Sequence, residues 1–367
     1  MNLLTSPFIM QRGIDVNQLG EEERRLAVTR GIDFLYSTAC DIEHFEVYGF
    51  DFLSCFHAIS LTQADTLRLR AQSICAELAC RWRSAHPTLP AELDADTLTQ
   101  FLIAANVADN IGLPDSAMKA AICRAANDFQ PQDFYWFDPR IEPPPEDVPE
   151  DCECGAGNPR GSVSCADCRG PLTMMSRYEV WLVALIRTYF GERFGVTLGA
   201  RYAEALQWLP SMRPYKRSES ESYADFIWSI YAVTHVVYTL NDYGVHRLLP
   251  AWLPDEYEFL WTQLPAVIQA DDYETSGEML DALKAFGLTR KDDRIRAAEE
   301  FIISRQNPDG SWGDPDEADI YERYHPTLTA IDGLREHAWQ PAAARSQHVM
   351  SMVKQTRDFG EEVSSRF

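Results

Sequence analysis

The feature that most constrains the fold is the spacing of the apolar residues, which follows a helical period along most of the chain. One example is the stretch that contains Leu67, Leu69, Ile74, Leu78 and Trp82. This spacing is typical of helices with one buried face. Few segments alternate apolar and polar residues with the period of two that a half-buried strand requires. The sequence therefore predicts an all-α fold, with four or five helices over residues 21–129.

A region without helical spacing divides the chain. Residues 136–172 contain the run Pro143-Pro144-Pro145 and a stretch rich in glycine and cysteine. Helical spacing then resumes at Ser176. A long loop inside a compact protein is usually functional or cross-linked. We therefore expect a helical N-terminal half at 1–135, an insertion at 136–172 and a helical C-terminal half at 173–367.

A weak internal repeat suggests how the helices are arranged. Residues 31–37 and 298–304 are similar, and each is followed by a helix with a histidine and an Ala-Ile pair, at His57 and at His325. Repeated helix pairs build rings or solenoids. The length of 367 residues exceeds the usual size of a single core and fits either two domains or one closed helical ring.

The insertion carries four cysteines at the spacing of a metal site, namely Cys152, Cys154, Cys165 and Cys168. Four thiolates form the tetrahedral ligand set of a structural zinc ion. A redox dithiol and a loop without a metal are the alternatives, although the setting does not resemble that of a redox C-x-x-C motif. A zinc ion with four protein ligands has no open position for substrate, so we expect it to hold the insertion against the helical body.

A turn motif near the C-terminus points to a fold family. Gln306, Asp309, Gly310 and Trp312 stand in the order Q-x-x-D-G-x-W, which resembles the repeat of squalene-hopene cyclases and related α/α-toroid proteins. The resemblance implies a helical ring in which Gln306 caps a helix end, Asp309 and Gly310 form the turn, and Trp312 stacks on the glutamine. The Asn-Pro-Asp-Gly sequence is also a strong turn signal by itself.

The next helix resembles a second toroid family. The segment Tyr324-His325-Pro326-Thr327 is similar to one in protein prenyltransferase β-subunits, and the resemblance implies a metal-ligating role for His325. The D-x-C ligands of that family and the D-x-D-D acid motif of protonating terpene cyclases are both missing from this sequence. The resemblance therefore supports the scaffold and does not transfer either chemistry.

A polar and aromatic stripe follows one face of the predicted helix at 226–243. Trp228, Tyr231, His235, Tyr238 and Asp242 are separated by three or four residues and therefore share a face. An imidazole and a carboxylate between aromatic rings suit a metal or an acid–base pair. Taken singly, His235 is better explained as a hydrogen-bonded core histidine and Asp242 as a residue of the helix end.

Taken with His325, the stripe supplies a candidate site. Two histidines and one carboxylate bind non-haem iron or catalytic zinc, and without a metal the same groups can act as general acid and base. We expect catalytic roles for His235, Asp242, His325 and Tyr238, a second metal, iron or zinc, on the first three, and substrate contacts from Trp228, Tyr231 and Tyr324. His44 and His57 are further candidates, although a structural role is favoured for each.

The charge balance excludes some partners. The chain has 33 basic and 56 acidic residues and a net charge of −23, which disfavours nucleic acid and anionic membrane surfaces. It has no run of eighteen or more apolar residues and no basic start followed by an apolar stretch. We therefore expect a cytoplasmic protein without membrane insertion.

Two functions remain open. The first is a metalloenzyme or acid–base enzyme, of oxygenase, cyclase, lyase or transferase type, which converts a partly apolar small molecule or prenyl-like substrate in a toroid cavity. The alternative is a non-catalytic helical-repeat protein that binds a protein partner through its acidic surface and zinc loop. Convergence of His235, Asp242 and His325 in one pocket would favour the enzyme.

Overall fold

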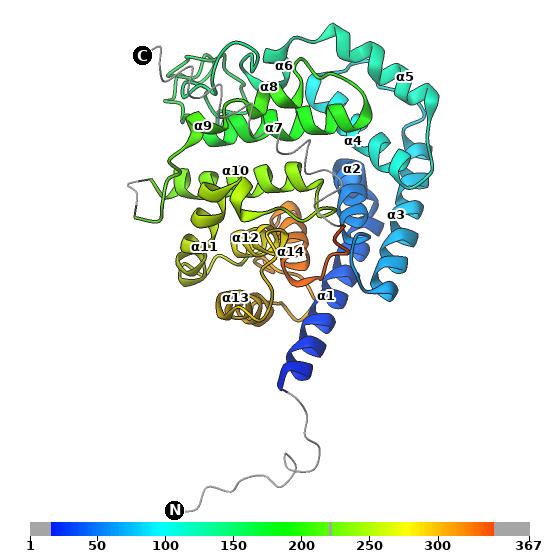
Figure 1. Ribbon diagram of the computed structural model, residues 1–367. Coiled ribbons are helices and arrows are strands. Elements are labelled where there is room, and N and C mark those ends of the chain that lie inside the picture. Colours follow the sequence, from blue (N-terminus) through cyan, green and yellow to red (C-terminus); the bar gives the residue numbers. More distant parts are fainter. Residues whose placement is uncertain (1–15, 220–221, 341–367) are drawn as a thin grey trace, which may run out of the picture.

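The structure is a computed structural model that describes residues 16–219 and 222–340 (Figure 1). Over these residues the chain forms α-helices, two short 3-10 helices and isolated β-bridges, without any strand. The predicted all-α fold is confirmed for this part of the chain. None of its helices is both long enough and apolar enough to span a membrane.

The helices before the insertion match the four or five predicted over residues 21–129, and a short α6 follows them. They are α1 Val16–Cys40, α2 Ile42–Ile59, α3 Asp65–Ala85, α4 Ala95–Asn110, α5 Ser116–Ala125 and α6 Pro131–Tyr135. The helices after the insertion are α7 Arg177–Phe194, α8 Tyr202–Leu206, α9 Leu209–Met212, α10 Tyr223–Asn241, α11 Pro254–Gln269, α12 Tyr273–Ala285, α13 Asp293–Ser304 and α14 Tyr321–Leu334.

Six of these helices form a closed series of contacts, which we call the six-helix circuit. Helix α2 packs against α4, α4 against α7, α7 against α10, α10 against α12, α12 against α14, and α14 again against α2. The helices between them in sequence pack on the outside of this series. Helix α3 contacts α2 and α4, while α11 and α13 contact α12 (Figure 1). Helix α1 contacts both α2 and α14, so the first and last described helices are joined.

The insertion between α6 and α7 lies against the short helices α8 and α9 (Figure 1). Two side chains at the end of α8 hold it there. Gln207 Nε2 and Trp208 Nε1 both donate to the main-chain oxygen of Pro139, at 2.7 and 2.8 Å. Val148 is also buried against the core. The insertion is therefore attached to the helical body at its N-terminal end.

The turn after α13 joins the outer helix α1 to α14, the last helix of the circuit. Gly310 takes φ 95°, and its N–H donates to the Asn307 oxygen at 3.0 Å, so Asp309 and Gly310 form the expected turn. Gln306 does not cap a helix end. Its Nε2 donates to the main-chain oxygen of Ala27 in the middle of α1, at 2.8 Å. The amide instead links the turn to the outside helix that packs on α14.

Trp312 is the central side chain of this turn. It is fully buried, and its indole N–H donates to the Ile302 oxygen at 2.8 Å, at the end of α13. Its main-chain N–H donates to Thr327 Oγ1 on α14 at 2.9 Å. The residue therefore joins α13 to α14 by packing and by two hydrogen bonds.

Replacement Trp312→Ala should lower the free energy of unfolding by about 3–5 kcal/mol, because it leaves a large cavity at the junction of α1, α13 and α14. Trp312→Phe should cost less, since it keeps most of the ring and loses the bond to Ile302. Urea unfolding followed by circular dichroism measures both changes. Trp136→Ala, at a residue that is 37% exposed, is the control. Equal effects of Trp312→Ala and Trp136→Ala would contradict the assigned role.

Candidate functional site

A cavity of about 780 Å³ is enclosed by the six-helix circuit. All six helices line it, and most contribute residues three, four and seven positions apart. On α14, for example, these residues are His325, Leu328, Thr329 and Asp332. Residues at this spacing share one face of a helix. Each helix of the circuit therefore turns one face to the cavity, and a volume of this size can hold a small organic molecule.

The cavity wall is acidic and aromatic on one side and largely apolar on the other. Helices α10, α12 and α14 supply imidazoles, carboxyl groups and a tyrosine, whereas α4 and α7 supply apolar residues such as Ile103, Val107 and Ile186. The carboxyl groups of the wall belong to Asp51, Asp242, Glu278, Asp281 and Asp332. A partly apolar ligand with polar groups at defined positions fits this distribution.

The structure brings four of the expected site residues to this cavity. His235, Tyr238, Asp242 and His325 all line it. The three residues expected to contact substrate, Trp228, Tyr231 and Tyr324, are not part of its wall.

Two of those three residues donate hydrogen bonds to acidic side chains. The Tyr231 hydroxyl donates to Glu274 Oε1 at 3.0 Å, and the Tyr324 hydroxyl donates to Asp51 Oδ2 at 2.8 Å. Tyr324 is fully buried. The ring of Trp228 packs against that of Tyr231 at a tilt of 56°, with ring centroids 5.5 Å apart. These residues position the polar wall and do not form its surface.

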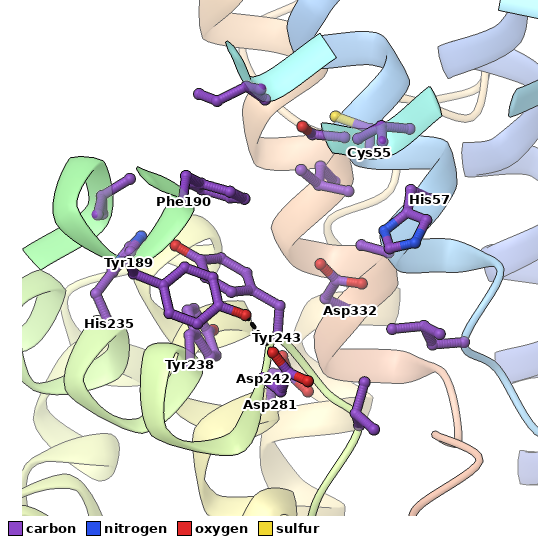
Figure 2. Close-up of a pocket in the computed structure, with 18 of the residues that line it drawn as sticks. Cys55, His57, Tyr189, Phe190, His235, Tyr238, Asp242, Tyr243, Asp281 and Asp332 are labelled. Carbon is purple, nitrogen blue, oxygen red and sulfur yellow. Dashed lines mark hydrogen bonds between the residues drawn. The ribbon is translucent and has the colours of Figure 1, made fainter. Parts of the chain in front are cut away.

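His235, Asp242 and His325 do not form a metal-ligand group. In residues 16–219 and 222–340, the four cysteines are the one set of potential ligands whose atoms all lie within 4.8 Å of one another. Asp242 Oδ1 instead accepts a hydrogen bond from the Tyr189 hydroxyl at 2.5 Å (Figure 2). His325 Nδ1 lies 2.9 Å from Glu274 Oε1. The expected second metal therefore remains a prediction for which the side-chain geometry gives no preformed site.

His235 and Glu278 form the most chemically distinctive pair in the wall. Burial lowers the pKa of His235 to about 4, and burial raises the pKa of Glu278 to about 8. At neutral pH the imidazole is therefore neutral and the carboxyl group is protonated. His235 Nδ1 lies 3.8 Å from Glu278 Oε2, so the contact joins two uncharged groups and is not an ion pair.

Hydrogen bonds next to this pair fix the tautomer of His235. The Thr234 hydroxyl donates to Glu278 Oε2 at 2.6 Å, which lowers the pKa of that carboxyl group, but the effect of burial is larger. The same hydroxyl lies 3.0 Å from the main-chain oxygen of Tyr231. His235 Nδ1 is 2.9 Å from the same Tyr231 oxygen, which can only accept. Nδ1 therefore holds the imidazole proton, and Nε2 has the lone pair.

His325 has the opposite protonation state. Burial disfavours its charge, but the hydrogen bond and the charge of Glu274 dominate, so the pKa of His325 rises to about 9. Burial likewise opposes ionisation of Glu274, and the bond from His325 nevertheless lowers the pKa of that carboxyl group. The two residues form an ion pair between α14 and α12 at neutral pH. The ring of Tyr321 stacks on His325, with centroids 5.0 Å apart.

A strained turn shapes the aromatic part of the wall. Asp242 and Tyr243 end α10 with φ values of 64° and 51°. A bulky residue seldom takes this conformation, and two non-glycine residues in succession store strain. The turn places the Tyr243 ring 5.2 Å from that of Tyr189 and 5.9 Å from that of Tyr238 (Figure 2). Strain is thus located at the cavity, which is common at functional sites.

Sequence reasoning missed most of the acidic wall. Glu278 and Asp281 stand on α12 and Asp332 on α14, and none of the three was a candidate. A signal was present, because Glu274, Glu278 and Asp281 have offsets of four and seven and share a helix face. The two further histidine candidates differ. His57 lines the cavity, whereas His44 lies outside it beside Asp41.

The four cysteines lie together in the insertion and could hold a metal ion. Cys152 Sγ lies 3.5 Å from Cys168 Sγ, and Cys154 Sγ lies 3.6 Å from Cys165 Sγ. These separations exceed the sulfur–sulfur bond of a disulfide, which is about 2.05 Å. The Gly170 N–H points to Cys168 Sγ at 3.4 Å. None of the four lines the cavity, so this group is separate from the helical site.

Comparison with known proteins gave no match to a family model, a curated protein or a solved structure. A function is therefore proposed below from the geometry of the cavity and of the cysteine group.

The ion pair of His325 and Glu274 predicts how stability depends on pH. The folded pKa of His325, about 9, is above its ordinary value of 6.5, so the pair stabilises fully below pH 6.5 and loses this effect as the pH rises through 9. The loss should be about 3 kcal/mol, at ~1.4 kcal/mol for each pKa unit. Urea unfolding at both ends of this range measures it.

In this test His325→Gln should remove the loss of about 3 kcal/mol that comes from His325, because glutamine does not titrate. A smaller loss between pH 6.5 and 8 should remain, because buried Glu278, whose pKa is about 8, ionises over this range. His44→Gln, outside the cavity, should keep the wild-type pH dependence. An unchanged pH dependence in His325→Gln would show that the pair is not charged as described.

Proposed function

We propose that this chain is an enzyme that moves protons on a partly apolar small organic molecule held in the cavity. The observation that carries this proposal is the pair of Glu278, a buried carboxyl group with a pKa of about 8, and His235, a neutral imidazole, in one cavity wall. Two groups whose environments move their pKa values in opposite directions are suited to act as acid and base. An interaction protein needs neither the cavity nor the pair.

In the proposed reaction the substrate gains one proton and loses another. Glu278 donates its proton to the substrate, and His235 Nε2 removes a proton from a neighbouring position of the same molecule. The sum is an isomerisation, a cyclisation or an elimination, and it requires no oxidant, reductant or co-reactant. Negative charge that develops on the substrate is stabilised by the His325 imidazolium. Positive charge is stabilised by the ring faces of Tyr238 and Tyr243. Transfer of the proton from His235 to Glu278 through solvent restores the starting state.

We further propose that the helices form an α/α toroid. The closed series of contacts from α2 to α14 and back, with intervening helices outside it, supports this arrangement. So does the presence of all six circuit helices in the cavity wall. The toroid would explain why residues from both halves of the chain meet in one site, as Asp51 of α2 and His325 of α14 do.

The proton-transfer proposal can be tested without a known substrate. The protein is incubated in D2O with a metabolite extract of its source cells, and mass spectrometry identifies molecules that gain deuterium or change structure. Wild-type protein should label at least one compound, and Glu278→Gln should lower the rate by roughly 100-fold or more, since general acid catalysis contributes about that much. His235→Gln should act in the same direction.

The matched control is Glu179→Gln. Burial also raises the pKa of Glu179, to about 7, but this residue does not line the cavity. The control should label compounds at the wild-type rate. The rate should fall as the pH rises through about 8, where Glu278 loses its proton, and as it falls through about 4, where His235 gains one. Equal rates in Glu278→Gln and the wild type would reject the proposal.

We also propose that the four cysteines bind one structural zinc ion. Zinc–sulfur bonds of about 2.3 Å in a tetrahedron place the sulfurs about 3.8 Å apart, close to the 3.5 and 3.6 Å separations in this group. Gly155 and Arg169, with φ of 83° and 66°, follow the two cysteine pairs and bend the backbone around the sulfurs. Four thiolates complete the ligand shell, so the ion would stabilise the insertion and would not bind substrate.

Replacement of Cys165 and Cys168 by serine should abolish zinc binding, because two of the four ligands are lost. Elemental analysis should fall from one zinc per chain to none, and limited proteolysis should cut within residues 136–172. Serine at Cys40 and Cys80, two exposed cysteines outside this group, is the control and should keep the zinc. Unchanged metal content in the Cys165 and Cys168 variant would contradict the zinc proposal.

A further inference from the structure

Two arginines line the cavity and take no part in the proton transfer proposed above. Arg193 lies in the last turn of α7, and Arg335 follows directly after α14. A guanidinium group in a cavity wall is a strong binding group for anions. Whether each guanidinium group can bind a ligand depends on the hydrogen bonds it already makes.

Each arginine is held by one aspartate through its Nε atom. Arg335 Nε donates to Asp332 Oδ1 at 2.6 Å, and Arg193 Nε lies 3.2 Å from Asp242 Oδ1. A contact through Nε fixes the plane of the guanidinium group and leaves its outer Nη atoms available. The two aspartates therefore orient the arginines toward a further partner.

Arg335 has a donor that no protein atom satisfies. Its side chain is 2% exposed, and Nη1 has no hydrogen-bond partner within the described part of the chain. A buried donor of a charged group without an acceptor is costly. Nη1 has almost no accessible surface, so a ligand oxygen would reach it only after a small movement of the side chain.

The two arginines act on one region of the cavity. The charges of Asp242, Arg193 and Arg335 all act on His57, whose pKa is lowered mainly by burial. Figure 2 shows His57 and Asp332 across the open space from Tyr189 and Phe190. Both arginines line the same cavity as His57.

We propose that Arg193 and Arg335 bind a carboxylate group of the substrate. This inference rests on the proposed function, since it names the substrate class of the same cavity. The substrate is then an organic acid whose apolar body lies along Ile103, Val107 and Ile186 and whose other end reaches Glu278 and His235.

Local charge selects a carboxylate over a phosphate. Two arginines and the two aspartates that hold them sum to zero formal charge, so a bound monoanion leaves one net negative charge, whereas a phosphate dianion leaves two and is disfavoured more strongly. Asp281, which lies 2.5 Å from His337 Nε2, adds a further carboxyl group to the wall. The net charge of −23 repels anions from the protein as a whole, but screening over about 8 Å confines selection to groups inside the cavity.

The test is calorimetric titration of the full chain with four probes: octanoate, octanamide, octylamine and inorganic phosphate. Octanoate should bind at least about tenfold more tightly than octanamide, which has the same shape without the charge. Arg193→Gln and Arg335→Gln should each weaken octanoate binding by at least about tenfold. Arg193 is half-exposed, so its variant should fold even if the buried Arg335 variant does not.

Arg187→Gln is the matched control, because Arg187 stands on the same helix but pairs with Asp96 outside the cavity. It should bind octanoate as the wild type does. Octanoate affinity tests the carboxylate site and deuterium labelling tests the proton transfer, so failure of one proposal is distinguishable from failure of the other. Tighter binding of octylamine than of octanoate, displacement of octanoate by equimolar phosphate, or full octanoate affinity in Arg193→Gln would each overturn the inference.

Discussion

The packing of α1 against α14 is the contact on which the cavity depends. It joins the first and last described helices. The turn at 306–313 strengthens it, because Gln306 donates to the Ala27 oxygen of α1 and the Trp312 main-chain N–H donates to Thr327 of α14. Besides its direct contact with α12, α14 is packed on by α1 and α13, and these contacts support the helix that carries His325 and Asp332. The buried ion pair of Lys284 on α12 with Glu299 on α13, at 2.9 Å, strengthens the same region, and Lys284 Nζ also donates to the Gly333 oxygen of α14 at 2.7 Å. The helical frame therefore sets the distances within the polar wall.

A closed frame explains how several ionisable groups can stand in one buried wall. Isolated buried charges are costly, so each is either neutralised or paired. Glu278 and His235 are uncharged at neutral pH. His325 is paired with Glu274, and Arg335 is paired with Asp332. The wall is thereby divided into an uncharged acid–base pair and a set of oriented ion pairs. Under the proposed function, the uncharged pair would carry out the chemistry and the ion pairs would serve in binding.

The all-α fold could be predicted from helical spacing, and the grouping of the four cysteines from their positions in the sequence, because both depend on local pattern. It also placed His235, Tyr238 and Asp242 on one helix face, and all three line the cavity. The partners of these residues could not be found in the same way. Glu278 and His325 meet His235 only through contacts of α10, α12 and α14, and a periodicity argument applied to one helix does not show which face meets which neighbour. Trp228 and Tyr231 share the stripe of His235 yet lie behind the wall, since a helix face is wider than the strip exposed to a cavity.

The two ends of the cavity constrain each other. A substrate carboxylate at Arg193 and Arg335 would fix one end of the molecule, and the apolar wall of α4 and α7 would hold its body, so the position of the reacting atoms would follow from chain length alone. Binding energy gained at the arginines could then be used to place those atoms between Glu278 and His235, where proximity lowers the barrier to proton transfer. The strained turn at Asp242 and Tyr243 would then serve both ends of the cavity. Asp242 orients Arg193 at the binding end, and the neighbouring Tyr243 ring lines the cavity toward the acid–base pair. A relaxed helix end would separate these two side chains, and the binding end would lose its fixed relation to the reacting end.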